Sequence, residues 1–250
     1  MNKKQSIYEN LAQKKGQIAI LVDPEKTQDE KQIKTLTDKA KFANVSYFFI
    51  GGSTVTREQF QLTTRLLKKH SAIPLVIFPG SNHQLSGDAD ALLYLSLLSG
   101  RNPEYLIGQH VASAMEVLQL NLEILPTSYI LIDGGSKSSV TYVSQTTPIP
   151  RDQKTIAINT AIAGNLQGKK ITYFDAGSGA KKPLQSEIIT SLNKLIDTVT
   201  IVGGGIREVA QIKAFKNAGA NVIVIGNKIE EDIDFLLNIK ELEREKKESY

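Results

Sequence analysis

Eight short runs of apolar and β-branched residues are spread along the whole chain, and they limit most strongly what it can fold into. Each run is apolar throughout instead of alternating with polar residues, which is typical of strands buried on both faces of a parallel sheet. Segments with helical periodicity separate most of the runs, so the pattern indicates repeated strand–helix units. The eight runs are residues 18–22, 46–50, 74–78, 91–95, 128–132, 171–174, 198–202 and 221–225.

These units predict an α/β fold, a single TIM (β/α)8 barrel over residues 1–250. The length supports this prediction, because the 250 residues of the chain match the roughly 250 residues of one such barrel. The alternative is an open doubly wound sheet, which carries its phosphate loop after the first strand. Here the glycine-rich loops follow the seventh and eighth runs, which favours the barrel. No linker divides the chain, and a charged helix or tail is expected from about residue 231.

Local signals place several of the crossover helices. Thr56 and Gln59 form the pattern of a capping box in front of a helix. Pro183 suits the first turn of a later helix, and Gly219 suits the C-terminal cap of the next one. The polar segment 133–155 contains two prolines, and it predicts a long loop that replaces or distorts the fifth crossover helix.

Composition excludes several classes of site and partner. The chain has no cysteine, which excludes disulfides, zinc knuckles, iron–sulfur clusters and thiol nucleophiles. Its three histidines are too few for a histidine-rich transition-metal site. The net charge is +4, and charges of both signs alternate along the chain, which indicates solvated helix faces and no nucleic-acid partner.

Two segments bear on the location of the protein. Residues 1–16 lack the apolar stretch of a secretory signal. The longest apolar stretch, residues 91–98, is far shorter than the ~20 residues that span a bilayer. We therefore expect a cytoplasmic protein, either fully soluble or in peripheral contact with a membrane.

Two glycine-rich loops indicate a phosphate site. GGGIRE (203–208) follows the seventh run and IGNKI (225–229) follows the eighth. Glycines let the backbone approach an anion closely, and amides at the start of a following helix donate to phosphate oxygens. In (β/α)8 barrels the loops after strands seven and eight frequently form one phosphate site together.

Two further loops carry carboxylates at the ends of predicted strands. YFDAGSGA (173–180) follows the sixth run, where Asp175 can serve as a general base. VDPEKT (22–27) follows the first run, where Asp23 can orient a substrate or bind Mg²⁺, with Ser53 after the second run beside it. The structural alternative is that these side chains cap the helices that follow.

The segment from Phe78 to Ala114 has an unusually apolar middle for a barrel crossover. An apolar groove that opens at the phosphate site would suit a lipid diphosphate. The alternative is ordinary core packing of the fourth strand. His83 in this segment is expected to be exposed and is not assigned to the site.

In the order of these motifs, the chain resembles the geranylgeranylglyceryl phosphate synthases, a family that includes the PcrB-type proteins. The resemblance runs from about Ile18 to Asn227, and the GRNPEYLIGQH segment is similar to group II of that family. It implies a TIM-barrel, Mg²⁺-dependent prenyltransferase of phospholipid biosynthesis. The implied reaction transfers a polyprenyl group, geranylgeranyl by the group resemblance, from its diphosphate to the C3 hydroxyl of sn-glycerol 1-phosphate, giving an ether-lipid precursor.

The resemblance also implies roles for individual residues. Asp23 and Ser53 match the metal positions, and Asp175 and Tyr173 match catalytic positions. The carboxylate of this loop is commonly glutamate in the family, whereas Asp175 is one methylene shorter. The residues implied to bind sn-glycerol 1-phosphate are Tyr173, Phe174, Asp175, Ala176, Gly177, Ser178, Gly179, Gly204, Gly205, Gly226 and Asn227.

Several alternatives and partner predictions stay open on the sequence. The donor can be heptaprenyl diphosphate instead of geranylgeranyl diphosphate. A phosphosugar isomerase of the histidine or tryptophan pathway would use Asp23 with Asp133, and a catalytically silent lipid-binding barrel would turn over neither substrate. The resemblance implies a homo-oligomer, a dimer or a hexamer. Four lysines near the sixth run are interpreted as a solvated basic face, with contact with anionic lipid as the alternative: Lys169, Lys170, Lys181 and Lys182.

Overall fold

Eight parallel strands close into a barrel in the computed structural model, which describes residues 6–27 and 29–248, with side chains up to residue 242. Each strand pairs with its neighbours in chain order, and β1 pairs with β8. The predicted (β/α)8 barrel is therefore confirmed. The strands are β1 (Gln17–Val22), β2 (Tyr47–Ile50), β3 (Leu75–Ile77), β4 (Ala91–Leu97), β5 (Glu123–Leu131), β6 (Ile171–Asp175), β7 (Val199–Gly203) and β8 (Val222–Ile225).

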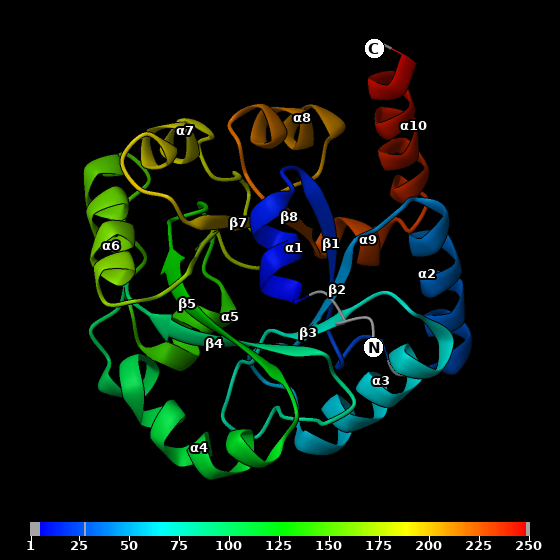
Figure 1. The fold of residues 1–250 in the computed structure, drawn as a ribbon, viewed down its shortest axis with the longest axis horizontal. Helices are drawn as coiled ribbons and strands as arrows, with labels where there is room; N and C mark the ends of the chain where they lie inside the picture. The colour runs from blue at the N-terminus through cyan, green and yellow to red at the C-terminus, as the bar shows by residue number, and fades with distance from the viewer. Residues whose placement is uncertain (1–5, 28, 249–250) are drawn as a thin grey trace.

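Helices surround the barrel, as Figure 1 shows. None of those that the structure describes is long and apolar enough to cross a bilayer. The charged segment predicted near the C-terminus is the helix α10, and its last residues, 249–250, lie outside the described residues. The helices are α1 (Ile7–Gln13), α2 (Glu30–Phe42), α3 (Arg57–His70), the π-helix η1 (Glu104–Gly108), α4 (Gln109–Gln119), α5 (Ser139–Ser144), α6 (Lys154–Leu166), α7 (Glu187–Asn193), α8 (Val209–Asn217), α9 (Asn227–Glu231) and α10 (Phe235–Glu248).

The strands are apolar throughout because each of them separates two cores. Along β6, for example, Tyr173 belongs to the core inside the barrel, whereas Phe174 belongs to the layer between strands and helices. Successive side chains of a strand point to opposite faces, so both faces need apolar residues here. The helix α1 adds Ile7 and Leu11 to the inner core.

The fifth strand–helix unit differs from its prediction. The strand β5 begins at Glu123, five residues before the predicted start. Most of the segment 133–155 is irregular, as predicted, and it holds only the short helix α5 before α6 begins; the crossover helix is not replaced by a loop, because α6 follows the two prolines. Its buried residues are Ala157, Ala161 and Gly164, which are too small to give a strong apolar periodicity. A Cβ atom at Gly164 would lie 2.0 Å from the Oγ of Ser128, so α6 packs directly on β5.

The predicted helix signals are confirmed in two cases and wrong in one. Thr56 and Gln59 form the capping box of α3, and Gly219 follows the C-cap of α8 with a φ of 90°. Pro183 does not lie in a first turn, because α7 begins four residues later. The N-cap position of α7 is Ser186.

Candidate active site

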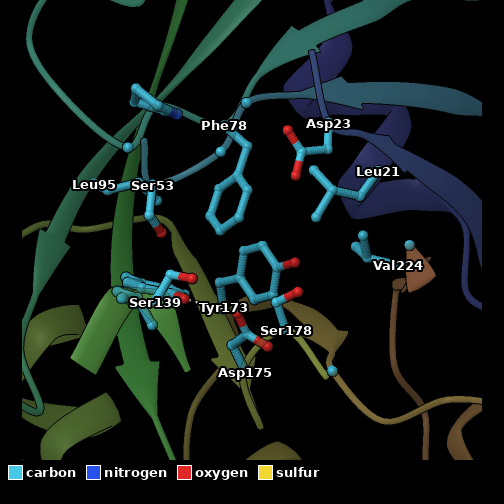
Figure 2. Close-up of a pocket in the computed structure, with 18 of the residues that line it drawn as sticks. Leu21, Asp23, Ser53, Phe78, Leu95, Ser139, Tyr173, Asp175, Ser178 and Val224 are labelled. Carbon is cyan, nitrogen blue, oxygen red and sulfur yellow. Dashed lines mark hydrogen bonds between the residues drawn. The ribbon is translucent and has the colours of Figure 1, made fainter. Parts of the chain in front are cut away.

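A cavity of about 290 Å³ lies at the C-terminal ends of the strands. Loops after β1, β2, β6, β7 and β8 form its polar part, and β4 with the helices after it forms the apolar part. Carboxylates from separate loops face this space: in Figure 2, Asp23 and Asp175 lie on different sides of the rings of Phe78 and Tyr173. This is the end of a (β/α)8 barrel where active sites lie.

Asp175 is the last residue of β6, and only 7% of it is exposed. Its Oδ2 accepts a hydrogen bond from the hydroxyl of Tyr129 at 2.7 Å, and its Oδ1 accepts one from the amide of Gly177 at 2.8 Å. Burial raises the pKa of Asp175, although both hydrogen bonds act in the opposite direction. The capping alternative is wrong for this residue, because Asp175 bonds within its own loop and lies far from the start of α7.

Three aromatic side chains line the floor of the cavity beside this carboxylate. The ring of Phe78 stacks on Tyr173 with centroids 5.1 Å apart, and Tyr129 meets both rings edge-on at 5.6 Å. Burial raises the pKa of Tyr129 and of Tyr173 well above the usual value, so both phenols are neutral and can donate hydrogen bonds. Tyr129 was not among the residues predicted for the site, although its position in an apolar strand next to β6 is the signal that places it inside the barrel.

The structure brings only part of the predicted β6 loop to the cavity. Tyr173, Asp175, Ser178 and Gly179 line it. The side chain of Phe174 is fully buried in the outer core, facing away from the cavity. Two more predicted residues, Ala176 and Gly177, do not line the cavity either, and Gly177 instead holds Asp175 through its amide.

The predicted glycine loops of β7 and β8 meet the β6 loop at the cavity. Gly204 and Gly205 both have positive φ, 81° and 69°. Gly226 and Asn227 lie at the start of α9, and all four residues line the cavity. The Oδ1 of Asn227 accepts a hydrogen bond from the amide of Gly179 at 2.8 Å, which joins the β8 and β6 loops.

Gly204→Ala is expected to lower the free energy of unfolding by more than about 2 kcal/mol. A Cβ atom at Gly204 would lie 2.6 Å from the Oδ1 of Asp175 and 2.7 Å from the backbone nitrogen of Gly177, in addition to its left-handed backbone. Gly179→Ala is the matched control, because its φ is 72° but nothing lies within 4 Å of its Cβ position. We expect about 1 kcal/mol there, and equal losses in urea denaturation would contradict the prediction.

Asp23 follows β1, and it lies against the loop after β2. Its Oδ1 accepts a hydrogen bond from the amide of Glu25 at 3.0 Å, and a Cβ atom at Gly52 would lie 3.0 Å from the same oxygen. Partial burial raises the pKa of Asp23, outweighing that hydrogen bond and the nearby charge of Lys26. Asp23 and Ser53 both line the cavity, and neither caps a helix, since the N-caps of α2 and α3 are Asp29 and Thr56.

The apolar part of the cavity is lined from β4, η1, α4 and α5 by residues such as Leu92, Leu95, Tyr105 and Val143. The hydroxyl of Tyr105 donates to the carbonyl of Val143 at 3.4 Å, so this side chain crosses from η1 to the end of α5. Other residues of β4 pack in the inner core. The apolar segment therefore serves both core packing and the cavity, which were predicted as alternatives.

Two histidines of this region lie in different places. His110 lines the cavity, with its ring centroid 4.2 Å from that of Tyr94, and burial lowers its pKa with a further contribution from Lys169. His83 does not line the cavity, and its ring nitrogens lie beside Ser81 and the carbonyl of Val55.

The four lysines near β6 do not form one basic patch. Lys169 and Lys170 precede the strand, whereas Lys181 and Lys182 follow it, so the pairs lie at opposite ends of the barrel. Lys170 also packs over the ring of Tyr8 at 5.2 Å. The alternative of a lipid-binding surface shared by all four lysines is therefore not supported, and peripheral membrane contact stays a prediction.

Comparison with known proteins agrees with this geometry. The model of the PcrB family matches residues 10–244. Among curated proteins, the geranylgeranylglyceryl phosphate synthase of Chitinophaga pinensis is 44% identical, with 92% of each chain covered, and that of Zunongwangia profunda is 42% identical, with 85% of this chain and 90% of the relative covered. One similar solved structure is (S)-3-O-geranylgeranylglyceryl phosphate synthase from Thermoplasma acidophilum in complex with its substrate sn-glycerol-1-phosphate. It superposes with a TM-score of 0.88 at 28% sequence identity, and the match covers 94% of this chain and 96% of that chain. With the family model matching nearly its whole length, this chain belongs to the PcrB family.

Proposed function

We propose that the protein transfers a geranylgeranyl group from its diphosphate to the C3 hydroxyl of sn-glycerol 1-phosphate. The observation that carries this proposal is one cavity with two chemically different parts. A buried carboxylate and positive-φ glycines line its polar part, and apolar side chains from β4, η1 and α5 line another part. The relatives named above carry the same activity in their names.

The polar end suits the acceptor. The phosphate of sn-glycerol 1-phosphate would lie against the loops of Gly204, Gly205 and Gly226, where backbone amides can donate to it. The free C3 hydroxyl would then point toward Asp175. In the reaction the hydroxyl oxygen forms a bond to C1 of the prenyl group, the bond from C1 to the diphosphate breaks, and Asp175 takes the hydroxyl proton.

The residues at Asp23 fit a magnesium ion that is shared with a substrate. No group of three or more His, Asp or Glu residues within the described part of the chain could hold an ion alone. Asp23 and Ser53 offer a carboxylate and a hydroxyl at the cavity, and Mg²⁺ is often bound by one or two carboxylates plus substrate phosphates. Bound there, Mg²⁺ would neutralise charge that develops on the diphosphate leaving group.

The apolar part of the cavity suits the prenyl chain, and Tyr105 reaches across it from η1 to α5. The names of the relatives favour geranylgeranyl diphosphate as the donor, with the longer heptaprenyl donor as the alternative. Initial rates with farnesyl, geranylgeranyl and heptaprenyl diphosphates at fixed sn-glycerol 1-phosphate test it, with the highest kcat/KM expected for the geranylgeranyl donor.

The isomerase alternative is not favoured by the cavity. It requires a second carboxylate from Asp133, but that side chain is exposed, bonds to the amide of Gly135 at 2.8 Å and does not line the cavity. Radiolabelled sn-glycerol 1-phosphate incubated with geranylgeranyl diphosphate and Mg²⁺ should pass label into an organic extract. Label that stays in the aqueous phase would contradict the proposed transfer, and it would favour a silent lipid-binding barrel if both substrates still bind.

The homo-oligomer implied by the resemblance, a dimer or a hexamer, also stays a proposal, and an apolar stripe on the outer helices supports it. Val111, Met115 and Leu118 share one face of α4, and Ile107 precedes them on η1. They are 58–78% exposed. Residues 102–120 contain no lysine or arginine, whereas helices that bind membrane surfaces are rich in both. A second copy of the chain is therefore the better occupant of this stripe.

Val111→Lys is expected to weaken self-association at least about tenfold, because a buried unpaired charge costs several kcal/mol. Leu195→Lys is the control, since Leu195 is 61% exposed but lies outside the stripe. Light scattering coupled to gel filtration measures both masses at several concentrations. Unchanged mass for Val111→Lys would contradict the proposed interface.

A further inference from the structure

The short helix α9 ties together three neighbouring loops at the mouth of the cavity. Its contacts reach the loops after β6, β7 and β1. They are Asn227 with Ser178 and Gly179, Glu231 with Arg207 in a two-pronged ion pair of 2.7 and 2.9 Å, and Glu230 with Lys26.

Glu230 lies in the middle of a path of hydrogen bonds that runs from Lys26 through Glu230 and Asn227 to Gly179. One of its oxygens, Oε2, accepts from the Nζ of Lys26 at 2.8 Å and from the Nδ2 of Asn227 at 3.2 Å. The opposite end of the Asn227 amide holds the β6 loop through the amide of Gly179. Only 20% of the Glu230 side chain is exposed, and it lines the cavity with Lys26 and Asn227.

Lys26 has two carboxylates within reach, and Glu230 holds it more closely. Its Nζ lies 2.8 Å from Glu230 and 3.7 Å from the Oδ2 of Asp23. Partial burial opposes the charge of Lys26, but these two carboxylates outweigh it and raise its pKa. Without Glu230, the ammonium group would pair with Asp23 and compete with a divalent cation for that carboxylate.

We propose that Glu230 is a positioning residue that couples the acceptor end of the cavity to the diphosphate end. The inference rests on the proposed function, which assigns the β6–β8 loops to the acceptor and Asp23 to the diphosphate with its cation. An acceptor that orders the side chain of Asn227 also orders Glu230, and Glu230 holds the ammonium group of Lys26 away from Asp23. The acceptor and the diphosphate with its cation therefore each favour binding of the other, which is positive coupling.

Calorimetric titration of sn-glycerol 1-phosphate, with and without saturating Mg²⁺ and inorganic pyrophosphate, measures this coupling directly. In the wild type we expect the added ligands to tighten acceptor binding about tenfold, within the usual range of coupling between sites. Glu230→Gln should reduce this factor below about twofold, and Lys26→Gln should do the same. Glu231→Gln is the matched control, because it removes an ion pair of the same helix that lies outside the path. It should keep the wild-type factor.

The outcomes separate the inference from the function beneath it. If the wild type does not bind sn-glycerol 1-phosphate at all, the proposed function is wrong. If it binds but shows no tightening, or if Glu230→Gln keeps the wild-type factor, the positioning role is wrong. Equal loss of coupling in Glu231→Gln would also overturn it, because the effect would then belong to α9 as a whole. Melting temperatures of all three variants check that each one folds.

Discussion

Asp175→Asn is expected to lower kcat by about two to four orders of magnitude, the usual contribution of a general base, while it raises the melting temperature. The asparagine oxygen can still accept from the amide of Gly177, and its NH2 group can donate to the hydroxyl oxygen of Tyr129, which reverses the direction of that hydrogen bond. What it cannot do is accept the proton of the glycerol hydroxyl. Single-turnover rates with both substrates bound measure the loss.

The expected gain in stability follows from the direction of the pKa shift. Burial raises the pKa of Asp175 in the folded state above its value in the unfolded chain. The stability that this group contributes is thus fully present below the unfolded pKa and is lost as the pH rises through the folded pKa. At neutral pH the buried carboxylate destabilises the fold, and Asn removes this effect. A gain of about 1 kcal/mol would raise the melting temperature by roughly 2–4 °C.

The same shift predicts how activity depends on pH in the wild type. The carboxylate can act as a base only above its folded-state pKa, so kcat/KM should fall on the acid side at a higher pH than an ordinary aspartate would give. Tyr129→Phe is the control, because it removes a hydrogen bond that lowers the pKa of Asp175. The acid limb should move to still higher pH in that variant. A variant Asp175→Asn that is both active and unchanged in stability would contradict the assignment.

The arrangement of strands was predictable because strands buried on both faces need long apolar runs. The two elements that were not predicted correctly, α6 and the start of β5, each have a physical reason. The helix α6 was missed because it packs on β5 through alanine and glycine, which leaves almost no apolar periodicity. The start of β5 was missed because Pro126 interrupts its pattern, although this residue pairs in register with Tyr94 of the parallel strand β4.

The candidate site was predictable to the level of loops, and less so for single side chains. Residues at the C-terminal ends of parallel strands meet at one end of a barrel. The predicted barrel therefore already places Asp23, Asp175 and Asn227 around the same space. The direction of each side chain depends on strand register, which separates Tyr173 from Phe174. Contacts such as that of Lys26 with Glu230 join residues 204 positions apart, and no local sequence pattern predicts them.

Asp23→Asn is expected to lower kcat/KM by about two to three orders of magnitude, consistent with the several kcal/mol that a metal-stabilised leaving group represents. The substitution keeps the shape of the side chain and an oxygen for the amide of Glu25. It removes the negative charge that would hold the cation beside the diphosphate. Ser53→Ala should cost about tenfold or less, because a neutral hydroxyl ligand can be replaced by water.

Initial rates across a Mg²⁺ titration separate these two variants. If Asp23 holds the cation, Asp23→Asn should need far more Mg²⁺ and should not reach the wild-type rate even at saturation, whereas Ser53→Ala should approach it. Binding of sn-glycerol 1-phosphate alone should be unchanged in Asp23→Asn, because its phosphate would contact the loops after β6, β7 and β8. Equal turnover of the wild type and Asp23→Asn at saturating Mg²⁺ would remove Asp23 from the metal site, and weaker acceptor binding in that variant would place its role in the fold of the loops instead.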